Sequence, residues 1–180
     1  VNTSGFGLLV APFGGIDRRL SANPIAAGIP RRNAPPIILD ISTCSIAEGK
    51  IKVARNRGQN VPEGCIIDHE GRPTTDPTLF YAQPPGAILP FGGHKGYGLS
   101  VITELLAGAL TGGGCSNPQN NEFLSNGMFT IILKPEVFGP QTRFDKDVDE
   151  FVTFLKGSRR IEGVDEILLP GEIERRTREI

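Results

Sequence analysis

The apolar residues of this 180-residue chain form short runs that glycine and proline interrupt. Two runs have the length and the β-favouring residues of buried strands, namely residues 35–43 (PPIILDIST) and residues 127–135 (GMFTIILKP). Residues 6–10 offer a further candidate strand that enters a turn at Gly14 and Gly15. In residues 48–64 (EGKIKVARNRGQNVPEG) apolar and basic residues alternate only briefly, so the pattern fits a short strand or a short helix equally.

Apolar spacings of three and four residues predict one helix in the middle of the chain and another near its end. The first follows Gly98 and stops at glycines 112–114, and its apolar positions are Leu99, Val101, Ile102, Leu105, Leu106, Ala109 and Leu110. The second covers residues 145–157, with Asp145 as N-cap and an inward face of Val148, Phe151, Val152 and Leu155. The charged C-terminal tail, after a Pro-Gly turn, is predicted to be helical.

Residues 62–90 contain six prolines and three glycines, which favours a long ordered loop over regular structure. Long loops in compact domains often carry function. Together with the short strands and the two helices, this pattern predicts an α/β fold in a single domain that spans residues 1–180.

Charge and composition exclude several classes of partner. Nineteen basic and twenty acidic residues give a net charge of −1, which argues against a nucleic-acid or membrane-surface binder. The three cysteines show no CxxC spacing, so they indicate neither a disulfide framework nor a metal site and fit a cytoplasmic location. No apolar run approaches the roughly 18 residues that cross a bilayer. Because the chain begins at Val1 without an initiating Met, we expect it to be part of a longer polypeptide.

Residues 91–98 (FGGHKGYG) carry the most distinctive candidate chemistry. Glycines permit close backbone approach, and the helix that follows presents amide groups and a positive dipole end toward the loop. His94 and Lys95 add hydrogen-bond donors and positive charge, a combination that suits the phosphates of a nucleotide cofactor. The spacing matches neither a Walker A loop nor GxGxxG. The alternative is a tight glycine turn with a solvated Lys95 and a hydrogen-bonded His94.

Five sequence blocks occur in the order and spacing of one known family. They are residues 23–30 (NPIAAGIP), 39–51 (LDISTCSIAEGKI), 71–77 (GRPTTDP), 89–100 (LPFGGHKGYGLS) and 105–112 (LLAGALTG). The chain thereby resembles the second type of malate/L-lactate dehydrogenases, whose members include L-sulfolactate, ureidoglycolate and 2,3-diketo-L-gulonate dehydrogenases. The resemblance implies an NAD- or NADP-dependent enzyme that interconverts a 2-oxo acid and its 2-hydroxy acid by hydride transfer.

The same resemblance implies a mixed, mostly antiparallel sheet flanked by helices, a cofactor site unlike the Rossmann type, a two-domain polypeptide and commonly a homodimer. Its cofactor residues fall on Asp40, Ile41, Ser42, Thr43, Cys44, His94, Lys95, Gly171 and Glu172. Two separate arguments thus assign His94 and Lys95 to the cofactor. For Asp40, a turn in which its carboxylate binds nearby amides is the alternative.

The family's substrate segment falls on Glu48, Gly49 and Lys50, where a lysine charge suits a substrate carboxylate. A surface ion pair between Glu48 and Lys50 is the alternative. Where relatives place Thr or Ser before the block at 23–30, this chain has Ala22, so a substrate hydrogen bond is expected to be missing.

The catalytic residues remain unassigned within this sequence. The family's general acid is a histidine in the N-terminal part of the polypeptide, so we expect it upstream of this chain. We assign His69, in the polar stretch IDHEGRP, to an exposed turn. Two functional hypotheses follow: a dehydrogenase whose acid lies outside this chain, or a non-catalytic, truncated nucleotide-binding protein. A P-loop-like phosphotransferase is disfavoured because no hydroxyl residue follows Lys95 to hold Mg²⁺.

Overall fold

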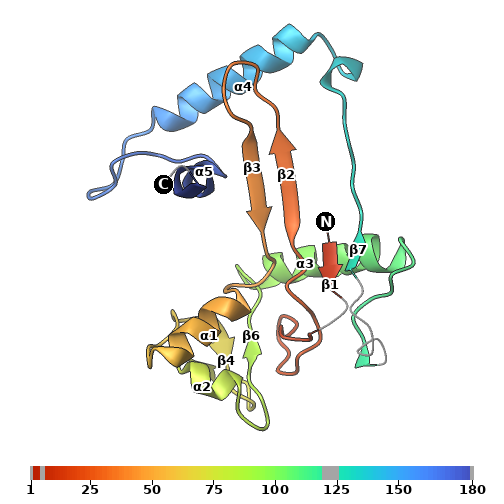
Figure 1. The fold of residues 1–180 in the computed structure, drawn as a ribbon, viewed down its shortest axis with the longest axis vertical. Coiled ribbons are helices and arrows are strands. Elements are labelled where there is room, and N and C mark those ends of the chain that lie inside the picture. The colour runs from red at the N-terminus through yellow and green to blue at the C-terminus, as the bar shows by residue number, and fades with distance from the viewer. Residues whose placement is uncertain (1, 5–6, 119–125, 179–180) are drawn as a thin grey trace. The chain divides into compact units, whose positions relative to one another are not determined.

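A computed structural model describes residues 2–4, 7–118 and 126–178 of the chain (Figure 1). The residues fall into two compact units, which we describe separately. Unit 1 comprises Val1–Ile25 and Ile41–Thr130, and unit 2 comprises Ala26–Asp40 and Ile131–Ile180. The fold is mixed α/β with small sheets, and every strand pair whose register is resolved is antiparallel, as predicted at this coarse level.

The centre of unit 1 is a three-stranded antiparallel sheet in the order β5-β4-β6, made of β4 (Ile66–Ile67), β5 (Pro73–Thr74) and β6 (Ala87–Ile88). Helices α1 (Glu48–Asn56) and α2 (Pro77–Phe80) lie beside it (Figure 1). The prediction of a loop over residues 62–90 was therefore wrong. The dense prolines and glycines shorten each element instead of preventing it.

Large apolar side chains from distant segments form the core of unit 1. Val10, Ile51, Ile66, Phe80 and Ile88 are each at most 1% exposed. Ile51 explains why residues 48–56 form a helix, because the helical turn brings this side chain onto the core while its basic neighbours stay outside. The strand expected at residues 6–10 does not form over residues 7–10, where Val10 makes only isolated bridges. Residue 6 lies outside the described residues.

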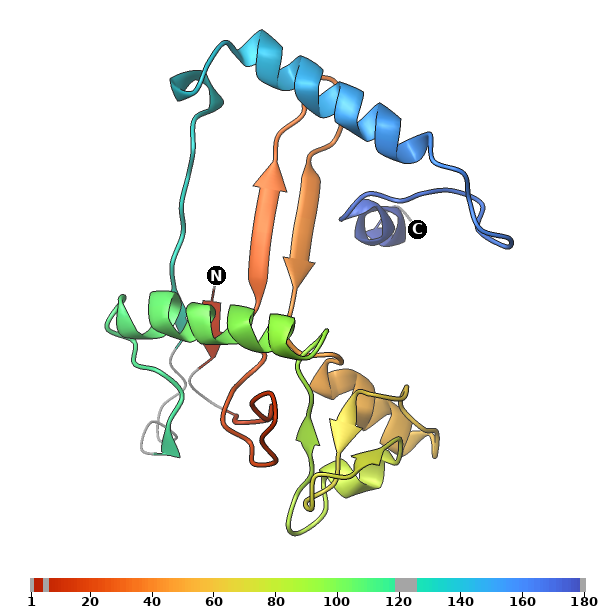
Figure 2. The ribbon, with the colours of Figure 1, turned by 180° about the vertical axis from the view of Figure 1, so that it is seen from behind.

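The central helix of unit 1 begins earlier than predicted. Helix α3 spans His94–Thr103 and continues without a break into the π-helical segment η1 (Glu104–Ala109), as Figure 2 shows from behind. Its start at His94, and not at Gly98, places the His-Lys pair in the first turn. Much of the predicted apolar face is exposed: Leu99, Ile102, Leu105 and Leu110 are 40%, 52%, 51% and 65% exposed, whereas Val101 and Leu106 are half-buried. Small and polar residues occupy the buried face instead.

Next to η1, strand β1 (Asn2–Ser4) pairs antiparallel with β7 (Asn126–Met128). Only glycine fits at position 127, because a Cβ there would come within 1.6 Å of the Ala107 carbonyl oxygen. The strand predicted over residues 127–135 ends at Met128. Residues 131–133 belong to no strand and are exposed, with Ile132 at 92%.

Most of unit 2 consists of a strand pair and helices. Strand β2 (Ile25–Ile29) pairs with β3 (Ile37–Ile41), and the two strands run in opposite directions (Figure 1). The first residue of β2 and the last residue of β3 belong to unit 1. Unit 2 also contains a 3-10 turn, η3 (Pro135–Val137), and helices α4 (Gln141–Lys156) and α5 (Glu172–Arg178). Helices at 145–157 and in the tail were predicted correctly, although α4 begins after Pro140 and not at Asp145. Of its predicted inward residues, Val152 is buried, whereas Phe151 is 58% exposed.

Candidate functional site

Unit 1 brings one predicted cofactor segment against the stretch that leads into the His-Lys pair. The Phe91 amide donates to the Thr43 carbonyl at 3.1 Å, and the Ser45 amide donates to the Leu89 carbonyl at 2.9 Å. Cys44 and Pro90 form an antiparallel bridge between these bonds. Residues 43–45 and 89–91 thus lie side by side, and α3 begins three residues after Phe91.

His94 and Lys95 are exposed in the first turn of α3, which has Gly93 as its N-cap. Gly93 has φ +62°, a conformation that favours glycine. Loop carbonyls already accept from two early amides, since Lys95 N–H donates to Gly92 at 3.4 Å and Gly96 N–H donates to Phe91 at 2.9 Å. The positive potential therefore comes mainly from the Lys95 side chain and the helix dipole. Among the described residues, Lys95 has no acidic partner in an ion pair.

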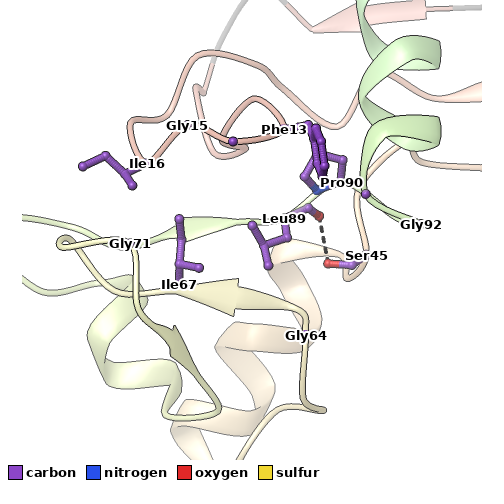
Figure 3. A pocket seen from close by; sticks show the side chains of 12 residues that line it. Phe13, Gly15, Ile16, Ser45, Gly64, Ile67, Gly71, Leu89, Pro90 and Gly92 are labelled. Atoms are coloured by element: carbon purple, nitrogen blue, oxygen red, sulfur yellow. Dashed lines mark hydrogen bonds between the residues drawn. The ribbon is translucent and has the colours of Figure 1, made fainter.

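A cavity of about 490 Å³ opens beside this helix start, within unit 1. Figure 3 shows Phe13, Ile67, Leu89 and Pro90 around it, and glycines line much of the remainder. Ser45 contributes a hydroxyl, but its one hydrogen is directed to the Leu89 carbonyl at 2.8 Å or the Cys65 carbonyl at 3.0 Å. The Phe13 ring meets the His94 ring edge-on with centroids 6.0 Å apart. This lining suits an uncharged, flat ligand group next to an anionic one.

A second cavity of about 400 Å³ brings predicted cofactor and substrate residues together. Ser42, Cys44 and Lys50 all line it, and Ser45 lines both cavities. The Cys44 thiol donates to the Ser42 hydroxyl at 3.2 Å, which keeps the predicted cofactor segment compact. A lysine beside hydroxyl groups can bind the carboxylate of a small acid.

Glu48 does not pair with Lys50, contrary to the ion-pair alternative. Its carboxylate accepts a hydrogen bond of 2.5 Å from the Tyr81 hydroxyl. Burial of the ring, followed by this bond and the charge of Glu48, raises the pKa of Tyr81 to about 12. Gly49 is exposed in the same first turn of α1.

Tyr81→Phe is expected to destabilise the protein by about 1 kcal/mol, because it removes the donor to Glu48. Since the folded-state pKa is raised, the protonated hydroxyl stabilises the folded protein below pH 10, and this contribution is lost as the pH rises from about 10 to 12. Urea unfolding at pH 7 measures the first effect, and tyrosinate absorbance measures the second. The control is Tyr97→Phe, whose hydroxyl makes no hydrogen bond within the described part of the chain. An equal loss of stability in both variants would contradict the assignment.

In unit 2, the third predicted cofactor segment lies against strand β3. The Ile38 amide donates to the Pro170 carbonyl at 3.2 Å, and a Cβ on Gly171 would come within 2.9 Å of the Ile38 carbonyl oxygen. Asp40 is exposed two residues further along β3, and Ile41, the last residue of that strand, is half-buried. The structure therefore brings Gly171 onto the strand that carries Asp40.

Glu172 is held by basic groups of unit 2. Its carboxylate accepts from Lys156 Nζ at 2.8 and 2.9 Å and from the Leu169 amide at 2.8 Å. Burial alone would raise the pKa of this carboxyl, but the bonds from Lys156 and Leu169, with the charges of Lys156 and Arg175, lower it below its usual value. These contacts orient Glu172 at the start of α5.

Glu172→Gln is expected to cost about 0.5 to 1 kcal/mol at pH 7, the range of a partly screened ion pair. Because the folded-state pKa is lowered, this contribution is present above the unfolded value of about 4.3 and disappears as the pH falls through the folded value. Unfolding free energies measured at a series of pH values below 7 should therefore show the gap between wild type and variant narrowing as the pH falls below about 4. Glu174→Gln, an exposed neighbour, is the control. A gap that does not change with pH would contradict an ionic origin.

His69 lies exposed in a tight turn, as predicted. The Asp68 carboxylate accepts from the Glu70 and Arg72 amides at 2.9 Å each and so closes this turn. Sequence reasoning missed Phe13 and Ser45 as lining residues. Ser45 directly follows the predicted cofactor segment, so extending that segment by one residue would have found it, whereas Phe13 meets the site only through the fold. The described residues contain no cluster of three potential metal ligands.

No helix among the described residues is both long and apolar enough to cross a membrane.

Comparison with known proteins supplies the family. The chain is 43% identical over 169 residues to an L-lactate dehydrogenase of Cupriavidus necator, which covers 92% of this chain and 48% of that protein. It is 40% identical over 174 residues to hydroxycarboxylate dehydrogenase B of Escherichia coli, covering 94% of this chain and 48% of the relative.

The solved structure of sulfolactate dehydrogenase from Methanocaldococcus jannaschii matches with a TM-score of 0.82 and 39% identity, over 99% of this chain and 52% of that one. The chain thus spans about half the length of the curated relatives it matches. The family profile described as malate/L-lactate dehydrogenase matches residues 1–180. The chain therefore belongs to the malate/L-lactate dehydrogenase family.

Proposed function

We propose that residues 1–180 form the NAD(P)-binding domain of an oxidoreductase that interconverts a 2-oxo acid and its 2-hydroxy acid. The observation that carries the proposal is the pairing of residues 43–45 with residues 89–91 in unit 1. A segment that is assigned to the cofactor thereby lies next to the stretch that leads into the His-Lys pair, although the two are far apart in the sequence. The names of the family's members support the class of reaction.

The residues present fit a nicotinamide dinucleotide. Lys95 is a cation without an acidic partner in the described part of the chain, and it lies at a helix start that favours phosphate. The adjoining apolar cavity of about 490 Å³ can accommodate a base, and Ser42 offers a hydroxyl. When bound, the nicotinamide ring supplies or accepts the hydride. We propose a site unlike the Rossmann type; Asp40, Gly171 and Glu172, which the resemblance also assigns to the cofactor, belong to unit 2.

In the proposed mechanism, the residues of this chain bind and orient the reactants. Lys95, with His94 beside it, holds cofactor phosphate, and Asp40, Ile41 and Ser42 position the ribose, as the family resemblance implies. Lys50 binds the substrate carboxylate, and Glu48 and Gly49 shape the same turn. We propose that a histidine upstream of these 180 positions transfers the proton, as the family resemblance implies, and that His69 in its exposed turn does not. We also propose a homodimer and a cytoplasmic location, in which the three cysteines stay reduced.

Titration with NADH and with NADPH, followed by nicotinamide fluorescence, tests the binding part of this proposal and distinguishes the two cofactors. A turnover assay with pyruvate and oxaloacetate on the longest native polypeptide tests the reaction. His69→Ala serves as the control, which we expect to leave binding and turnover unchanged. Binding without turnover of any 2-oxo acid would instead favour a non-catalytic nucleotide-binding protein. Absence of binding to either dinucleotide would contradict the proposal.

A further inference from the structure

A buried carboxylate in unit 1 lies outside the site described above. Glu104, at the start of the π-helical segment η1, is only 5% exposed. Its Oε1 atom accepts from Asn23 Nδ2 and from the Ser116 hydroxyl, each at 2.7 Å. Its Oε2 atom accepts from the Ser116 amide, also at 2.7 Å. Among the described residues it makes no ion pair, so these hydrogen bonds are what compensate its burial.

Asn23 connects Glu104 to the turn before strand β2. Its side chain is fully buried, and its amide also donates to the Ser100 hydroxyl at 2.9 Å. Among the described residues it is the only non-glycine with a positive φ, at 40°. A residue in this conformation persists only where its surroundings hold it. The contacts with Ser100 and Glu104 therefore fix the turn onto the α3–η1 helix.

The same turn holds the predicted cofactor segment. The carbonyl of Ala22 accepts from both the amide and the hydroxyl of Thr43, at 2.9 and 3.0 Å. The Thr43 carbonyl in turn accepts from the Phe91 amide at 3.1 Å, just before the start of α3. These hydrogen bonds connect Glu104, through Asn23 and the neighbouring Ala22 carbonyl, to Thr43 and Phe91. The α3–η1 helix, which begins three residues after Phe91, leads back to Glu104 and closes the circuit.

We propose that Asn23 and Glu104 are positioning residues for the cofactor site. They fix the separation between residues 42–44 and the helix start that carries His94 and Lys95, and thereby set the affinity for the dinucleotide. The inference rests on the proposed function for its effect on binding. The claim that Asn23 and Glu104 hold Thr43 against Phe91 does not depend on the proposed function and can be tested without a ligand.

The arrangement of donors requires a carboxylate. Three donor groups meet two oxygen atoms that can only accept. In Glu104→Gln, one oxygen becomes an NH₂ group, which must face either the Asn23 amide group or the Ser116 N–H. Each orientation sets two donors against each other while Asn23 keeps its present orientation. A flip of the Asn23 amide would turn its Oδ1 atom, which is buried without a hydrogen-bond partner, toward the new NH₂ group, but it would then leave Nδ2 without its bond to residue 104. The variant therefore perturbs the circuit without opening a cavity.

The test compares Glu104→Gln, Asn23→Asp and the double variant in which acid and amide are exchanged. In the double variant, the amide introduced at position 104 can donate to the carboxylate introduced at position 23, and the Ser100 hydroxyl can rotate to donate as well. We expect each single variant to bind NADH or NADPH about tenfold more weakly, and the double variant to return within about threefold of wild type. Glu63→Gln, an exposed acid in unit 1, is the matched control.

Two further measurements separate positioning from general stability. If Glu104 acts through the helix start, its substitution should weaken binding less in a Lys95→Ala background than in wild type. Amide hydrogen exchange at Thr43 and Phe91 should accelerate in Glu104→Gln and recover in the double variant. Unchanged exchange at both amides would overturn the proposal, even if the wild type bound no dinucleotide. If exchange at these amides accelerates in Glu104→Gln but the wild type binds no dinucleotide, the result contradicts the proposed function and leaves the positioning role in place.

Discussion

Lys95→Ala is expected to weaken binding of NADH or NADPH by about 1 to 3 kcal/mol, or roughly 5- to 150-fold. The side chain is exposed at the first turn of α3, and within the described residues no carboxylate competes for it. Its charge is therefore available to a phosphate, and its loss removes a charge-assisted hydrogen bond. Nicotinamide fluorescence titration at low and high salt measures the effect, which should shrink as salt screens the charge.

Lys52→Ala provides the charge-matched control for this experiment. Lys52 is also exposed in unit 1, but it projects from α1 and lines neither cavity. An equal loss of affinity in both variants would indicate a general effect of net charge. Unchanged affinity in Lys95→Ala would remove Lys95 from the cofactor site.

Local chemistry explains why the His-Lys pair could be recognised from the sequence. The glycines on both sides, the single lysine and the following helix lie within a few residues of each other, so no tertiary contact is needed to see them. The strand over residues 37–41 and the helix over residues 141–156 were likewise predictable, because their patterns extend over several residues.

Residues 62–90 were mispredicted for a physical reason. Strands β4, β5 and β6 contain two residues each, which is too short for any periodicity to appear. Their pairing depends on contacts between Ile66 and both Thr74 and Ile88, which local propensity does not reveal.

The central helix illustrates a different limit of sequence patterns. Periodicity located an apolar face at Leu99, Ile102 and Leu105, but those side chains are exposed in unit 1. The buried face carries Gly96, Ser100, Thr103 and Glu104, where small size and hydrogen bonds permit close backbone contact. A pattern identifies which face is apolar, but not which face is covered. The circuit from Glu104 to Thr43 was therefore invisible in the sequence.

Gly96→Ala is expected to destabilise the protein by about 3 kcal/mol and to weaken dinucleotide binding together with stability. A Cβ at position 96 would lie 2.4 Å from the Phe91 carbonyl oxygen, 2.7 Å from the Thr43 carbonyl oxygen and 2.8 Å from the Phe91 nitrogen. All three are backbone atoms, so the helix start must move away from the bridge that joins residues 43–45 to residues 89–91.

Gly98→Ala is the matched control, because it makes the same substitution one helical half-turn further along. A Cβ at position 98 would meet nothing within 4 Å, so the better helix propensity of alanine should stabilise the protein by up to about 1 kcal/mol. Urea unfolding and NADH titration of both variants decide the matter. Opposite signs for the two alanines would show that close packing at position 96 holds the helix start. Two stabilising alanines would mean that Thr43 and Phe91 can move apart freely, and the site could not then depend on their separation.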